Sequence, residues 1–140
     1  MRRLISILCL SLGIFFVSEG GSFGQNVMFD DLVKRKGLYF LRFSSVPFTG
    51  EVIGHGQGSI KEGKRDGIWE KYYPNGKLLW SKTYKSGELE GAWLTYYITG
   101  QLRWEQHYKN GQLDGVWSKY LPSGELVSEE IFKDGALQDR

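Results

Sequence analysis

Residues 66–78 read DGIWEKYYPNGKL, and the pattern returns as EGAWLTYYITGQL at 90–102 and as DGVWSKYLPSGEL at 114–126. Corresponding positions are separated by 24 residues, with no insertion between copies. A fixed period of this length indicates an array whose units are single supersecondary elements. The glycines, the tryptophan and the tyrosine of each copy define the expected structural positions: Gly67, Trp69, Tyr72, Gly76, Gly91, Trp93, Tyr96, Gly100, Gly115, Trp117, Tyr120 and Gly124.

Each copy predicts two β-strands and the turns around them. The aromatic and β-branched residues of 68–73 suit a pleated, half-buried strand. Pro74-Asn75-Gly76 is a turn sequence, and Lys85-Ser86-Gly87 turns the chain again into the next copy. Helix is excluded because a glycine or proline falls every few residues. The sequence therefore predicts an all-β fold, an elongated antiparallel meander of stacked β-hairpin repeats whose neighbours share an aromatic face.

The rest of the chain divides around this array. We expect three repeats over 67–135 and, before them, a degenerate first repeat over 37–66 that caps the stack. Residues 25–36 form an N-terminal lead-in, of which residues 30–36 are too polar and short to classify. The tail, 136–140, is expected to fray.

The first 24 residues predict a cleaved signal peptide. Met1-Arg2-Arg3 is basic, residues 4–17 are uninterruptedly apolar, and small residues follow up to Gly24. The apolar run is shorter than the roughly 20 residues of a membrane-spanning helix, although an uncleaved anchor remains the alternative. We therefore expect an exported protein that is periplasmic, outer-membrane-associated or extracellular. Cys9, the single cysteine, lies inside the run, so the mature chain would have no disulfide or thiol nucleophile.

The charge pattern argues against two classes of partner. Removal of Arg2, Arg3 and Glu19 with the signal peptide changes the formal net charge from +2 to +1. The remaining charges are interspersed along the sequence, so no basic stripe is present to neutralise phosphates, and nucleic-acid binding is not expected. The small net charge also predicts no strong binding to anionic membrane lipids.

Candidate catalytic residues are sparse. His55 and His107 are the two histidines, and without a cysteine partner they do not predict a zinc site. The glycines around His55 are not followed by the Lys-Ser/Thr of a phosphate loop. Carboxylate pairs such as Glu88 and Glu90 fall on turns or on alternating strand positions. We therefore predict no enzyme activity, no cofactor and no metal site.

The aromatic residues are the candidate binding surface. Exposed ladders of flat rings bind peptides, sugars or lipid headgroups with little loss of side-chain entropy. Tyr73, Tyr97, Trp80 and Trp104 are the predicted surface residues. The repeated tryptophan at 69, 93 and 117 has two readings, a buried core or a binding ladder, with the buried core favoured because large aromatic residues are mostly buried.

The motif at 66–78 and its two copies resemble the MORN-repeat variant family, over about residues 37–135. The resemblance implies a β-hairpin array with an interaction role and no catalytic residue. The third copy departs from the others, with Ser128 in the position of Trp80 and Trp104, and Leu121 in that of Tyr73 and Tyr97.

These observations favour an exported protein-interaction or scaffold module of the cell envelope. Two alternatives remain at this stage. One is a cell-wall glycan-binding module. The other is an antitoxin-like component of a toxin–antitoxin pair, which the export signal disfavours. Edge-to-edge self-association is a further expectation for an array with open ends.

Overall fold

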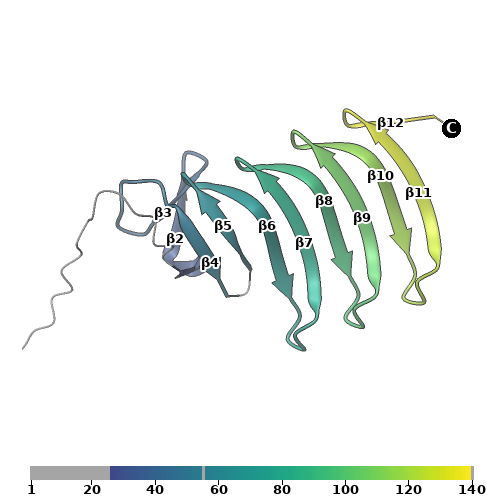
Figure 1. Ribbon diagram of the computed structural model, residues 1–140, viewed down its shortest axis with the longest axis horizontal. Helices are drawn as coiled ribbons and strands as arrows, with labels where there is room; N and C mark the ends of the chain where they lie inside the picture. Colours follow the sequence, from purple (N-terminus) through teal and green to yellow (C-terminus); the bar gives the residue numbers. More distant parts are fainter. Residues whose placement is uncertain (1–25, 55, 140) are drawn as a thin grey trace, which may run out of the picture.

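The computed structural model describes residues 26–54 and 56–139 of the chain. Ten strands form one sheet, and from β4 onward they lie side by side in chain order (Figure 1). Across the sheet the strands are β1 (Val27–Met28), β4 (Gly50–Ile53), β5 (Gln57–Lys61), β6 (Lys64–Tyr72), β7 (Leu78–Lys85), β8 (Glu88–Tyr96), β9 (Leu102–Lys109), β10 (Gln112–Tyr120), β11 (Leu126–Lys133) and β12 (Ala136–Leu137). The predicted all-β meander is confirmed.

Two features of the N-terminal part depart from a simple meander. β1 pairs with β4 in parallel, whereas the other pairs of the sheet are antiparallel. Residues 37–66 were expected to form a degenerate first repeat, but β3 (Leu38–Leu41), at its start, pairs with β2 (Leu32–Arg35) in a separate two-stranded sheet. A short 3₁₀ turn, η1 (Phe29–Asp31), joins β1 to β2. Residues 26–36 of the lead-in therefore form regular structure, and their apolar side chains Val27, Phe29 and Leu32 pack in or against the core.

Two-residue turns join each repeat to the next. Ser86 and Gly87 have φ angles of 50° and 92°, and Asn110-Gly111 and Asp134-Gly135 repeat this conformation. Two consecutive residues with positive φ match the right-handed twist of antiparallel strands. The Gly87 amide also donates to the carbonyl of Arg65, at 2.8 Å, and Gly111 and Gly135 make the corresponding bonds in their repeats. Each turn therefore ties its own hairpin to the preceding repeat.

The hydrophobic core lies at the N-terminal end of the sheet. Its buried members are Val27, Phe48, Val52, Ile60 and Trp69. Phe29, Leu32, Tyr39 and Leu41, from η1, β2 and β3, are packed against them. The segment before β4 thus forms a second layer over the first strands of the sheet (Figure 1).

The chain ends were expected to lie outside the array. At the C-terminus, β12 pairs with β11 through Phe132–Leu137 and Lys133–Ala136, so Ala136 and Leu137 extend the sheet. The predicted signal peptide, 1–24, lies outside the described residues. Within residues 26–54 and 56–139, no helix is long and apolar enough to span a membrane.

Candidate binding face

All five tryptophans project from one face of the sheet. Residues that are directly opposite each other in antiparallel strands share a face. One such row of opposed residues consists of Trp69, Lys82, Trp93, Gln106 and Trp117. A second row, two positions along the strands, consists of Lys71, Trp80, Thr95, Trp104 and Lys119. We call this side of strands β6 to β10 the Trp face.

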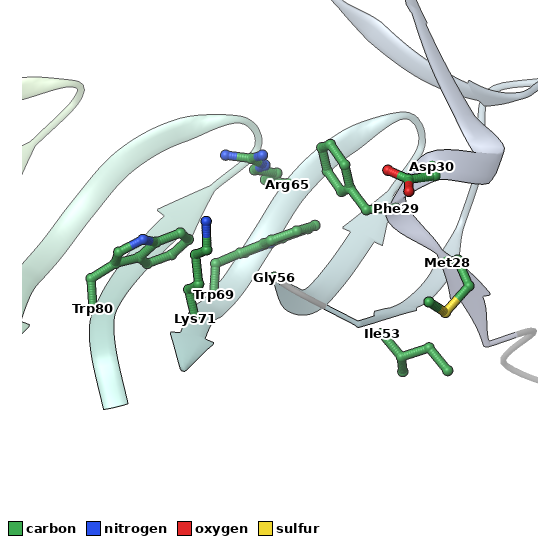
Figure 2. A pocket seen from close by; sticks show the side chains of 9 residues that line it. All are labelled: Met28, Phe29, Asp30, Ile53, Gly56, Arg65, Trp69, Lys71 and Trp80. Carbon is green, nitrogen blue, oxygen red and sulfur yellow. The ribbon is translucent and has the colours of Figure 1, made fainter. Parts of the chain in front are cut away.

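The chain covers the Trp face over the first repeat. The Phe29 ring packs edge-on against Trp69, with centroids 6.1 Å apart, and Trp69 is only 1 % exposed. A pocket of about 220 Å³ remains beside this contact, between Phe29 and Trp80 (Figure 2). Arg65 and Lys71 extend into the same region from β6. At its covered end, the Trp face therefore has a small pocket that is lined by aromatic rings and by two cationic side chains.

Within residues 26–54 and 56–139, the Trp face of the second and third repeats has no such cover. Trp93, Trp104 and Trp117 are half-buried by their neighbours in the sheet, and the apolar residues from η1, β2 and β3 do not reach them. Trp104 and Trp117 stack nearly parallel, with centroids 5.4 Å apart. The three rings, together with Thr95 and Gln106, line a shallow hollow of about 250 Å³. This open part of the face offers a flat aromatic surface with two polar side chains.

Cations lie against these rings. The Lys82 ammonium is 3.8 Å from the ring centre of Trp93 and 4.8 Å from that of Trp80. Lys119 lies 5.0 Å from Trp104, and the Arg65 guanidinium lies 4.5 Å from Trp69. Partial burial lowers the pKa of Lys82, and the nearby charge of Arg65 lowers it further. The ring faces stabilise these cations, and the ion pairs formed among the described residues do not include them.

The indole N–H groups show how the repeats differ beneath the rings. Trp69 donates its Nε1–H to the carbonyl of Ser59, at 3.0 Å. The Nε1 atoms of Trp93 and Trp117 are buried without a partner in the described part of the chain. Gly58 underlies Trp69 and lets its ring lie against the backbone of β5. Lys82 and Gln106 occupy the corresponding positions opposite Trp93 and Trp117.

The four predicted surface residues fall into two groups. Trp80 and Trp104 lie on the Trp face, in the same row. Tyr73 and Tyr97 instead tie repeats together: their hydroxyl groups donate to the backbone carbonyls of Tyr96 and Tyr120, at 2.8 and 2.9 Å. Sequence reasoning missed the cations of the face, because their alignment with the rings depends on strand register.

Groups with catalytic potential are scarce in the described residues. The Nε2 atom of His107 lies 3.0 Å from the Glu105 carboxylate on the same strand, on the face away from the tryptophans. No group of three or more histidine, cysteine or acidic residues in this part of the chain is arranged to hold a metal. His55 lies outside the described residues. The Trp face is therefore the best candidate for a functional site.

A sheet of hairpin repeats with a binding-type face and a fixed 24-residue period defines the class: a β-repeat protein. Comparison with known families identifies the repeat itself, because the family model described as MORN repeat variant matches residues 65–86, 89–110 and 113–134. The chain belongs to the MORN repeat variant family. No curated protein and no solved structure matches the chain.

Proposed function

We propose that this chain is an exported, non-catalytic binding module of the cell envelope, and that it takes a partner protein on the open part of the Trp face. One observation carries the proposal. The chain's own N-terminal segment covers the Trp face at Trp69, whereas no residue of the described part of the chain covers the equivalent surface at Trp93 and Trp117 in this way. A partner segment would occupy on the later repeats the place that the N-terminal segment occupies on the first.

The chemistry of the open surface supports binding rather than catalysis. Half-buried aromatic rings supply contact area at little cost in side-chain entropy. The hollow at Trp93, Trp104 and Trp117 is shallow, and its polar lining is limited to Thr95 and Gln106. A family of structural repeats with no site chemistry fits a scaffold or binding role.

A glycan is the second candidate occupant, favoured by one feature. The Thr95 hydroxyl is buried among the rings without a hydrogen-bond partner in the described residues. A sugar ring stacked on tryptophan would bring hydroxyl groups close to it. Retention of the protein on purified cell-wall polysaccharide, lost in Trp104→Ala, would favour this candidate over a protein.

The test is site-specific photo-crosslinking in the native cells. Gln106 and His107 are sequence neighbours on β9, both half-buried, and they project from opposite faces. A photoreactive benzoylphenylalanine at Gln106 should capture a discrete partner protein, and one at His107 should not. Equal capture from both positions, or capture from neither, would contradict a partner on the Trp face.

The export part of the proposal has its own measurement. Mass spectrometry of the full-length protein recovered from its native cells should find a mature N-terminus at or near Gln25. The partner captured from Gln106 should then be an envelope protein. An intact Met1 with a cytoplasmic partner would contradict export and favour the antitoxin-like alternative.

A further inference from the structure

We propose that the segment bound by the open Trp face is acidic as well as aromatic, with its carboxylates received by Lys82 and Lys119. This inference rests on the proposed function and names the chemistry of the partner. It is carried by the distribution of charge between the two faces, by the lack of carboxylate partners for these lysines, and by the sequence of the segment that already covers the first repeat.

Charges that are interspersed along the sequence are distributed unequally between the two faces of the sheet. The Trp face carries four cations, Arg65, Lys71, Lys82 and Lys119, and one carboxylate, Glu130, which lies opposite Trp117 on β11. On the opposite face, one row of paired residues consists of Glu70, Ser81, Leu94, Glu105, Ser118 and Glu129. A net charge near zero therefore conceals a Trp face on which cations outnumber carboxylates. The opposite face carries a row of three carboxylates together with lysines at its strand ends, among them Lys85 and Lys109. Complementarity of this kind selects partners by charge.

The two lysines of the open face lack carboxylate partners in the described residues. Ion pairs in this part of the chain join Lys133 to Asp114 and His107 to Glu105, both away from the Trp face. Lys82 and Lys119 are half-buried against Trp93 and Trp104 instead. A carboxylate brought beside a partly desolvated ammonium gains more than it would at a fully exposed one, because screening by water is weaker there.

The segment that covers the first repeat shows which chemistry this face accepts. It reads Phe29-Asp30-Asp31, and its aromatic ring packs on Trp69 with the Arg65 guanidinium 5.5 Å from the centre of the Phe29 ring. Asp30 lines the same pocket as Arg65 and Lys71 (Figure 2). An aromatic residue followed by carboxylates is thus the chain's own occupant of a cationic, tryptophan-lined surface. The repeat places a similar surface, with Lys82 and Trp93, in the next unit.

The experiment uses the full chain and a synthetic peptide with the sequence of residues 26–33, NVMFDDLV. The indole N–H signals of Trp93, Trp104 and Trp117, assigned with Trp→Phe variants, are followed by NMR during titration with the peptide. We expect these three signals to move. A peptide carrying Asp30→Asn and Asp31→Asn should bind at least about 5-fold more weakly. Added salt should weaken the binding of the parent peptide.

Matched variants test the lysines. The double variant Lys82→Gln with Lys119→Gln should bind the parent peptide more weakly. The loss of affinity should be about as large as the loss caused by replacing the two aspartates of the peptide. The control, Lys85→Gln with Lys109→Gln, makes the same change in net charge at strand ends on the opposite face, and it should leave binding unchanged. If a variant folds poorly, the salt dependence of peptide binding to the unaltered chain still tests whether charge attraction contributes.

Three outcomes would overturn the inference: no movement of the three indole signals, equal binding of the two peptides, or equal loss with both lysine pairs. If vesicles of an anionic phospholipid shift the same signals and the peptide does not, the occupant of the Trp face is a lipid surface and the inference of an acidic protein segment is wrong. If photo-crosslinking from Gln106 captures a partner while the acidic peptide fails, the binding function stands and only its proposed chemistry is wrong. If both fail, the binding function falls as well.

Discussion

The residue that lies beside each repeated tryptophan on the neighbouring strand differs along the array. Gly58 lies beneath Trp69, Lys82 lies opposite Trp93, and Gln106 lies opposite Trp117. With no side chain at Gly58, Trp69 contacts the backbone and is buried. With longer side chains in that position, Trp93 and Trp117 leave their indole N–H groups without partners in the described residues. The missing side chain at Gly58 and the N-terminal cover together bury Trp69, whereas Trp93 and Trp117 remain half-buried.

The first prediction concerns Gly58→Ala. A Cβ atom at this position would lie 2.6 Å from Cδ2 of Trp69, so the ring must move or the backbone must shift. We expect the free energy of unfolding to fall by about 1–3 kcal/mol, as for other overpacked cores. Urea unfolding followed by fluorescence measures it. Gly56→Ala is the control, because its Cβ would meet nothing closer than 3.9 Å, and a loss of similar size there would contradict the explanation.

The second prediction concerns acid stability. Asp114 accepts hydrogen bonds from the Lys133 ammonium, at 2.7 Å, and from the Asp134 amide, and these lower the pKa of Asp114 below its usual 3.8. A carboxyl group whose pKa is lowered by folding stabilises the fold above its unfolded-state pKa. That contribution is lost as the pH falls below 3.8 through the folded-state pKa. We therefore expect the free energy of unfolding of the unaltered chain to fall more than that of Asp114→Asn in that pH range. Urea unfolding at a series of pH values measures both, and parallel curves of stability against pH would contradict the prediction.

At the scale of elements, the short turns set the register of the array. Each two-residue turn places both residues at positive φ, and its glycine amide bonds to the preceding repeat. Non-glycine residues tolerate this conformation unequally: asparagine and aspartate are enriched there, because their short polar side chains bond locally. Asn110 and Asp134 follow this preference, and Ser86 does not. The turn between β7 and β8 is therefore the least favourable of the three.

The third prediction follows for Ser86→Asn. We expect the free energy of unfolding to rise by about 0.5 kcal/mol, the lower end for substitutions that improve a local conformation. Thermal unfolding followed by circular dichroism at two urea concentrations measures it. Ser123→Asn is the control, because Ser123 lies in the turn between β10 and β11, inside a repeat, and does not have positive φ. A gain of the same size at Ser123 would show that the effect is not conformational.

At the scale of the molecule, each strand contacts its immediate neighbours and the core lies at one end (Figure 1). Arrays of this kind have stabilities close to the sum of their units and interfaces. The last repeat contributes to the open Trp face without supporting the core. The N-terminal cover contributes to the core without reaching the last repeat. The stabilising core and the open Trp face are therefore separated along the length of the sheet.

The fourth prediction compares two truncations. A chain that ends at Asn110 should still unfold cooperatively, because it keeps all members of the core. A chain that lacks residues 26–49 uncovers Trp69 and loses Val27 and Phe48, so it should be less stable by at least about 3 kcal/mol than the first truncation. Urea unfolding of both proteins measures the difference. Equal stabilities would show that the cover does not support the core.

Local signals made much of this fold predictable. Trp69, Trp93 and Trp117 gave the period, and pairs such as Asn110-Gly111 marked the turns, because turn conformation and strand preference depend on neighbouring residues. The candidate site was predicted in part. Trp80 and Trp104 lie on the Trp face as binding candidates, whereas the hydroxyl groups of Tyr73 and Tyr97 bond between repeats.

The sequence by itself determined the all-β class, the repeat and the sharing of one aromatic stripe, since these follow from a period of two residues in strands and of 24 residues between copies. Only the tertiary structure decided which tryptophan is core and which is open, because the cover over Trp69 comes from residues distant in sequence. It also decided that Lys82 and Lys119 share a face with the rings. Strand register assigns each side chain to a face, and a one-residue slip would send every cation to the other side.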